Sequence, residues 1–416
     1  MPSNVDGVKL ERRRDSQQWI LDWLVKQTGR EQNFAYDERR LPSEVKSYAM
    51  IPRAVHKLAA HCESIARAAE AHGHRETARQ LYYKAVDHYH LAQHSIFEDD
   101  NPDKIFLYER LAACYDRVME LADYSIERVE IPWEGGSLQA ILHLIPGKPK
   151  APTVLFIPGM DMVKEVMADP DNNPFIKRGM HLMVLDGPGQ GVSNIRKIRV
   201  TADNHERASS AAVSYLCNRP EVDADKIGVA GNSMGSYWGH RLAALDSRVK
   251  AIATGAACYG GKRNIFEMAS PRFKQVFMYM AGIHDEEEFD RMAAEMHLQG
   301  YGKRTHCACL VTTGEYDPLA PLEQTLALFE ELAGPKELWV FENDFHTSGK
   351  GGSGMKNLAG LSLYPFIADW LQDALAGRLP KDLNRRILVP QSSGPGPYGS
   401  VVEDFSLRAR HPKGAL

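Results

Sequence analysis

A regular alternation of short apolar runs with stretches of helical spacing limits the possible folds of this chain more than any other feature. The apolar runs lie at 153–157, 181–185, 226–230, 249–253, 308–312 and 338–341. Buried strands that alternate with helices are typical of a mostly parallel sheet with helices on both faces. A hairpin precedes them, with alternating strands at 125–131 and 138–144. We therefore predict an α/β fold, a doubly wound sheet that begins with an antiparallel hairpin.

The N-terminal part of the chain has a different pattern. Residues 1–125 contain no convincing strand, and the apolar spacing predicts three helices at about 52–71, 75–96 and 103–123. The second helix is similar to a tetratricopeptide helix, but the period of about 34 residues does not recur, which favours a single bundle. We predict a helical domain at 1–125, a catalytic domain at 126–378 and an extended tail at 379–416, where the periodicity is lost.

Composition and charge exclude several classes of partner. The net charge of −4 over 416 residues gives no basis for binding nucleic acid. No apolar run approaches the roughly 20 residues that span a bilayer, and the polar stretch at 1–14 is not a secretory signal. The six cysteines include no CxxC pair, which favours reduced thiols. We expect a cytoplasmic protein with neither a membrane nor a nucleic-acid partner.

The third of these apolar runs leads into a motif that carries chemistry. Residues 226–230 read as a buried strand, Gly231–Gly235 fits G-x-S-x-G, and 236–244 reads as a helix. A strand, a tight turn and a helix form the context in which this motif is a nucleophile elbow. A side chain at Gly231 or Gly235 would obstruct the crowded backbone of such a turn. The candidate nucleophile is Ser233; the alternative is that this pentapeptide is an ordinary Gly- and Ser-containing loop.

A serine nucleophile needs a base, and the base needs an acid that orients it. The carboxyl ends of neighbouring strands are where such groups gather in an open sheet. Asp317 lies on a turn after 308–312, with Glu315 as the competing carboxylate, and His346 follows 338–341. We favour Asp317 because Pro318 fixes its turn. The order serine, acid, histidine is that of the α/β-hydrolases.

Two backbone N–H groups are needed to bind the oxyanion that forms during acyl transfer. One is expected from Met234, directly after the nucleophile. The other is expected from Met160, in the loop after the first parallel strand, where Gly159 permits close approach. The carboxylate of Asp161 would repel an oxyanion, so we assign it a structural role, with Lys164 as its candidate partner.

Other candidate sites lack the residues that their chemistry requires. His90 and His94 are four apart on a predicted helix, but no third ligand accompanies them. The stretch 186–191 is glycine-rich yet lacks both dinucleotide and phosphate-loop patterns. His306–Cys309 lacks a second metal-binding cluster. We expect no metal and no cofactor.

The motifs together resemble a group within the α/β-hydrolases. The residues that carry the resemblance are Pro158–Asp161, Lys164, Glu165, Asp186–Gly191, Gly231–Gly235, Asp317 and His346. The group is that of the 2,6-dihydroxypseudooxynicotine hydrolases, the fermentation–respiration switch proteins and the fungal polyketide chain-shortening hydrolases. The resemblance covers about residues 50–375. It implies an α/β-hydrolase fold with an N-terminal helical cap, a homodimer, and hydrolysis of a carbon–carbon bond beside a ketone.

These observations leave three interpretations of function. The first is carbon–carbon hydrolysis of a small-molecule carbonyl compound, such as an aryl ketone, a diketone or a polyketide. The second is hydrolysis of an ester, lactone or thioester, which the same triad serves. The third, a non-catalytic interaction protein that binds through its helices, is the least expected because every triad element is present. The insert at 259–303 could line the substrate pocket or pack as ordinary helices.

Overall fold

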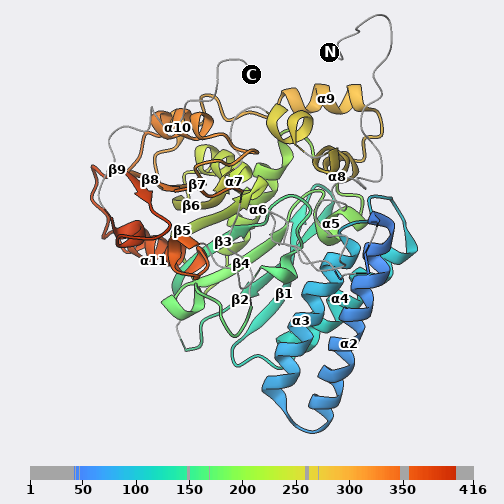
Figure 1. Cartoon of the computed structure of the whole chain (residues 1–416). Helices are drawn as coiled ribbons and strands as arrows, with labels where there is room; N and C mark the ends of the chain where they lie inside the picture. The colour runs from blue at the N-terminus through green and yellow to red at the C-terminus, as the bar shows by residue number, and fades with distance from the viewer. Residues whose placement is uncertain are drawn as a thin grey trace, which may run out of the picture.

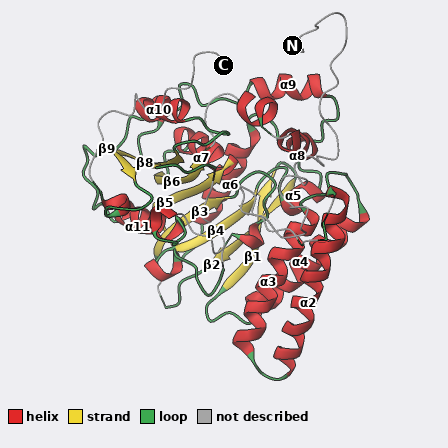
Figure 2. Cartoon of the chain, in the orientation of Figure 1, coloured by secondary structure: helices red, strands yellow, loops and turns green. Residues whose placement is uncertain are grey.

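The computed structural model describes residues 42–399, except 43, 46, 148, 149, 168, 258–261, 270 and 347–355. Within these residues, one sheet runs through the molecule, helices cover both of its faces, and three further helices lie beside its first strand (Figures 1 and 2). The first 41 residues of the predicted helical domain and residues 400–416 of the predicted tail lie outside the described residues.

The described strands join in the order β1-β2-β4-β3-β5-β6-β7-β8-β9. Their bounds are β1 Ile126–Trp133, β2 Gly136–His143, β3 Ala151–Ile157, β4 His181–Asp186, β5 Val222–Ser233, β6 Val249–Ala257, β7 Ala308–Gly314, β8 Lys336–Phe341 and β9 Asn384–Val389. The pairs β1/β2 and β2/β4 are antiparallel, and all later neighbours are parallel. The predicted α/β fold with a leading antiparallel hairpin is confirmed. Because the order reverses between β3 and β5, a crevice is expected at their carboxyl ends.

The predicted extended tail contains a strand that the sequence pattern does not indicate. Within 379–416, β9 pairs with β8, with Val340 opposite Leu388. Ile387 and Val389 are buried there, while Asn384 and Arg385 are exposed. Because the first half of this short edge strand is polar, its sequence shows too little polar–apolar alternation to predict a strand.

Helices cover the two faces of the sheet unequally. Helices α6 (Asn204–Cys217), α7 (Met234–Leu245) and α10 (Leu322–Glu331) share one core with Leu155 and Ile157 of β3. Helix α11 (Tyr364–Leu375) shares the opposite core with Val154 and Phe156. Since both faces of β3 are covered, its sequence is a continuous apolar run rather than an alternating one. None of the helices in the described part of the chain is long and apolar enough to cross a membrane.

The N-terminal helices form a bundle of α2 (Ile51–Ala71), α3 (Arg75–Gln93) and α4 (Pro102–Glu120). Asn101 caps α4 by accepting hydrogen bonds from the N–H groups of Asp103 at 3.0 Å and Lys104 at 3.1 Å. The bundle packs on β2 through Ile141 and on the segment after β3 through Val163 and Val166. That the bundle acts as a cap and a dimerisation domain stays a prediction.

The insert after β6 packs as helices within its described residues. It contains α8 (Pro271–Ala281) and α9 (Glu286–Ala294). The Phe266 ring lies 5.2 Å from the ring of Phe277 and 5.0 Å from that of Phe289, and all three side chains are buried. Helix packing therefore accounts for these aromatic residues.

Candidate active site

Ser233 lies at the sharp turn between β5 and α7, with φ 53° and ψ −120°. Such a backbone conformation is strained for a residue with a side chain. A Cβ atom on Gly231 would lie 2.5 Å from the carbonyl oxygen of Gly235. A Cβ atom on Gly235 would overlap the carbonyl of Ile157 at the end of β3. Both glycines are therefore required by the close approach of backbone around Ser233.

The structure brings the three predicted side chains into one hydrogen-bonded chain. Ser233 Oγ lies 2.7 Å from Nε2 of His346, and His346 Nδ1 lies 2.7 Å from Oδ2 of Asp317. The Asp317 side chain is fully buried, and its Oδ1 accepts from the N–H groups of Leu319 at 2.8 Å and Ala320 at 3.1 Å. With Asp317 accepting the Nδ1 proton, Nε2 is left to accept the proton of the Ser233 hydroxyl.

Glu315, the competing carboxylate, holds the loops together. Its Oε2 accepts from the Asn343 N–H at 3.0 Å, and the N–H of Tyr316 donates to the Asp344 carbonyl at 2.9 Å. These contacts tie the loop after β7 to the loop that carries His346. The geometry therefore favours Asp317 over Glu315 as the partner of the histidine.

The loop after β3 lies against the turn at Ser233. A Cβ atom on Gly159 would lie 3.1 Å from the carbonyl oxygen of Asn232 and 3.4 Å from Cβ of Ser233. The N–H of Met160 has no hydrogen-bond acceptor among the described residues. Met234 begins α7, where the first N–H groups of a helix have no intrahelical partner. The two N–H groups predicted to bind an oxyanion thus lie on the two segments that meet at Ser233.

Sequence reasoning missed the residue that holds this loop. Gln190 is fully buried, and its Nε2 donates to the carbonyl oxygens of Gly159 at 2.7 Å and Pro158 at 3.2 Å. The available signal was the glycine-rich stretch 186–191 directly after β4, a strand adjacent to β3. The position of this stretch at a strand end indicates that it belongs to the site. The sequence does not indicate which backbone carbonyls the Gln190 side chain binds.

Asp161 has a different partner from the one expected. Its Oδ2 lies 2.5 Å from Nδ1 of His94, at the end of α3, and Arg272 of α8 donates to the other ring nitrogen of that histidine. The structural role assigned to Asp161 therefore joins the loop after β3 to the bundle and to the insert. The described residues hold no group of three or more metal-ligating side chains.

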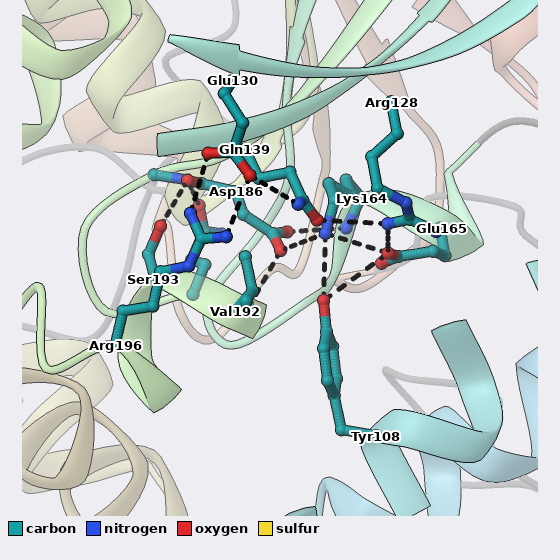
Figure 3. A network of polar contacts seen from close by, with 12 residues as sticks. Tyr108, Arg128, Glu130, Gln139, Lys164, Glu165, Asp186, Val192, Ser193 and Arg196 are labelled. Atoms are coloured by element: carbon teal, nitrogen blue, oxygen red, sulfur yellow. Dashed lines mark hydrogen bonds and ion pairs between the residues drawn. The ribbon is translucent and has the colours of Figure 1, made fainter. Parts of the chain in front are cut away.

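Lys164 instead lies at the centre of a buried ion network (Figure 3). Its Nζ lies 2.9 Å from Asp186 Oδ2, from Glu165 Oε1 and from the Tyr108 hydroxyl of α4. Arg128 Nη1 of β1 also contacts Glu165 Oε1, at 2.8 Å. Burial alone would lower the pKa of Lys164, but Asp186 and Glu165 outweigh it and raise that pKa, so the amine stays charged. Lys164, Glu165 and Asp186 therefore join the bundle to the sheet.

Comparisons with known proteins agree with this fold. A model of the family described as "Esterase FrsA-like" matches residues 62–340, more than half of the chain. The solved structure of 2,6-dihydroxy-pseudo-oxynicotine hydrolase superposes with a TM-score of 0.69 and 23% identity, over 88% of this chain and 98% of that one. At that identity the likeness shows the fold.

Relatives in sequence are hydrolases from fungi and a bacterium. The α/β-hydrolase gkaG of Penicillium citrinum is 32% identical over 228 residues, 52% of this chain and 52% of its own. The hydrolase pyiE of Pyricularia grisea is 25% identical over 390 residues, 83% of this chain and 82% of its own. The 2,6-dihydropseudooxynicotine hydrolase of Paenarthrobacter nicotinovorans is 25% identical over 269 residues, 64% of this chain and 69% of its own. The chain thus spans about half the length of gkaG. The protein belongs to the FrsA-like esterase family and has the α/β-hydrolase fold.

Proposed function

We propose that this enzyme hydrolyses a small-molecule carbonyl compound through Ser233, His346 and Asp317. The observation that carries the proposal is the pair of 2.7 Å contacts that link the serine hydroxyl to the histidine and the histidine to the buried carboxylate. A serine becomes a useful nucleophile when an adjacent base takes its proton, and a buried carboxylate fixes that base in the required tautomer.

In the proposed reaction, His346 Nε2 takes the hydroxyl proton while Ser233 Oγ forms a bond to the substrate carbonyl carbon. The carbonyl π electrons move to its oxygen, which the N–H groups of Met160 and Met234 stabilise. When the tetrahedral adduct collapses, His346 protonates the leaving group and an acyl-enzyme remains. Water, deprotonated by His346, then releases the acid and restores Ser233.

For the bond that breaks, we propose a carbon–carbon bond beside a ketone. The support is the family resemblance carried by 158–161, Lys164, Glu165 and 186–191. The leaving group is then a carbanion, which a second carbonyl group of the substrate stabilises as an enolate before it is protonated.

Ester, lactone or thioester hydrolysis is the second candidate. It is favoured by the description of the matching family as an esterase. The leaving group is then an alkoxide or a thiolate, and the enzyme groups have the same roles in both reactions.

The resemblance also supports two proposals about assembly. We propose that the bundle α2–α4 caps the catalytic domain and that the enzyme is a homodimer. Light scattering on the purified protein tests the dimer: the mass of two chains is expected, and the mass of one chain contradicts it.

Labelling with a fluorophosphonate probe tests the nucleophile. We expect an adduct on Ser233 that Ser233→Ala abolishes. Ser236→Ala is the matched control because it removes a hydroxyl three residues away, one that donates to the Gly255 carbonyl at 3.0 Å, and labelling is expected to persist. Absence of a Ser233 adduct in the unaltered enzyme contradicts the proposal.

Product masses from a panel of diketones, aryl ketones and esters distinguish the two bond types. Fragments produced from diketones or aryl ketones support carbon–carbon cleavage. Turnover of the esters alone supports the second candidate and contradicts the first.

A further inference from the structure

We propose that Gln190 is a positioning residue for the oxyanion hole, because its side-chain amide fixes the peptide plane that carries the N–H of Met160. This inference rests on the proposed function and deepens it. The carbonyl of Gly159 and the N–H of Met160 belong to one planar peptide unit and point in opposite directions. Gln190 Nε2 donates to that carbonyl at 2.7 Å, so holding the oxygen also sets the direction of the N–H.

The orientation of the Gln190 amide follows from its neighbours. Its Oε1 accepts from the Gly187 N–H at 3.1 Å, and a backbone N–H is only a donor. Its Nε2 faces the carbonyl oxygens of Pro158 and Gly159, which are only acceptors. A flipped amide would place donor against donor and acceptor against acceptor, so one orientation satisfies the whole set.

A second buried residue holds the amide from behind. His205 Nε2 lies 3.1 Å from Gln190 Oε1, and the Ser209 hydroxyl lies 3.4 Å from His205 Nδ1. The His205 ring stacks on Trp238 of α7 with centroids 3.8 Å apart and planes 3° apart. A Cβ atom on Gly187 would overlap this ring, which explains the glycine there.

His205 keeps one protonation state around neutral pH. Burial lowers its pKa to about 3, so the ring is neutral at neutral pH. The neutral ring donates its Nε2 proton to Gln190 and accepts at Nδ1 from Ser209. The hydrogen-bond directions in the series Ser209, His205, Gln190 and Gly159 are therefore fixed, and none of them changes with pH near neutrality.

This arrangement affects reactivity as well as position. Hydrogen bonds accepted by the Gly159 carbonyl polarise its peptide unit, which strengthens the Met160 N–H as a donor. Loss of an entire oxyanion donor lowers turnover by about 10²–10³-fold. Gln190 orients this donor but is not itself the donor. Removing its side-chain amide is therefore expected to lower the rate by a factor between about tenfold and that limit.

The test measures the rate at which a fluorophosphonate labels Ser233 in the full chain. In that step Ser233 Oγ bonds to phosphorus, fluoride leaves, His346 takes the proton, and the phosphoryl oxygen lies where the oxyanion would. We expect Gln190→Met to slow labelling at least about tenfold and to weaken binding of an alkyl trifluoromethyl ketone by the same factor. The ketone forms a tetrahedral adduct with the serine, so its affinity reports on the oxyanion site.

Two controls separate positioning from general damage to the loop. Ser193→Ala removes a buried hydrogen bond, 2.9 Å long, from the short helix after this loop (Gly191–Ile195) to the Asp186 carbonyl, and labelling is expected to stay within about twofold. Gln190→Glu places a carboxylate against the two carbonyls, and protonation turns it into a donor. The labelling rate of that variant relative to the unaltered enzyme is expected to rise as the pH falls from 8 to 5.5.

The outcomes are distinct from those that test the proposed function. Absence of labelling in the unaltered enzyme overturns the triad itself. Normal labelling there, together with labelling and ketone affinity within about twofold in Gln190→Met, overturns the role of Gln190 alone. An equal loss in Ser193→Ala overturns it too. If Gln190→Met does not fold, His205→Phe keeps a stacked ring without the donor, and unchanged labelling there contradicts the proposal.

Discussion

Replacing Lys164 by Met removes the amine at the centre of the buried network while keeping a chain of similar length. The amine contacts Asp186, Glu165 and Tyr108, each at 2.9 Å, and the three charged side chains have no solvent exposure. After the change, Glu165 keeps Arg128 at 2.8 Å. Asp186 keeps two neutral donors, the backbone N–H at position 164, at 2.7 Å, and the backbone N–H of Val192, at 3.1 Å.

One carboxylate, and not two, therefore loses its cation. Breaking a buried ion pair by removing one partner destabilises a protein by about 3–5 kcal/mol. We expect Lys164→Met to lower the free energy of unfolding by this amount at pH 8, measured by urea denaturation. Arg196→Met is the control because it breaks the exposed contact with Glu130, 2.8 Å long, where about 0–1 kcal/mol is expected.

The loss of stability in Lys164→Met is expected to depend on pH in a defined direction. Burial already raises the pKa of Asp186 above its ordinary value, and losing Lys164 raises it further. In the variant the folded state then binds a proton at a higher pH than the unfolded state does, so its stability increases as the pH falls. The deficit relative to the unaltered protein should shrink between pH 8 and pH 5. A loss below about 1 kcal/mol at pH 8, or a deficit that grows on acidification, would refute this reasoning.

Three further changes have defined outcomes. Asp317→Asn should lower turnover about 10⁴-fold because the histidine tautomer is no longer fixed; near-normal turnover contradicts the triad. Gly159→Ala places a methyl group 3.1 Å from the Asn232 carbonyl, so the loop must shift and fluorophosphonate labelling should slow by up to about 10²-fold. An unchanged labelling rate there means that the loop position is unimportant. Asn101→Ala removes the α4 cap and should lower the free energy of unfolding by about 1 kcal/mol without changing labelling.

The parts of the molecule that were predictable from sequence are those that depend on neighbours in the chain. The continuous apolar runs identified strands that are buried on both faces, and the order of Ser233, Asp317 and His346 followed from strand ends. Strand β9 was missed because its first three residues, Asn384, Arg385 and Arg386, are polar and its partner β8 ends 43 positions earlier, at Phe341. Only pairing to an existing sheet makes this segment a strand.

Side-chain partners that are distant in sequence could not be predicted. The sequence suggests the nearby Lys164 as the partner of Asp161. In the structure Asp161 contacts His94 at the end of α3, and Lys164 contacts Asp186. Likewise, the sequence marks Gln190 only as one residue of a glycine-rich loop. Its hydrogen bonds to Pro158 and Gly159 depend on β3 and β4 lying side by side, a tertiary fact.

The contact between His94 and Asp161 has a thermodynamic consequence. His94 at the end of α3 contacts Asp161, the residue after Met160. Docking of the bundle and ordering of the loop that carries the Met160 N–H are therefore energetically coupled. Coupling of this kind is reciprocal: a ligand that binds only the ordered loop stabilises the docked bundle by as much as docking favours the ligand. A covalent adduct on Ser233 should therefore slow amide hydrogen exchange at the end of α3, a segment that the adduct itself need not touch.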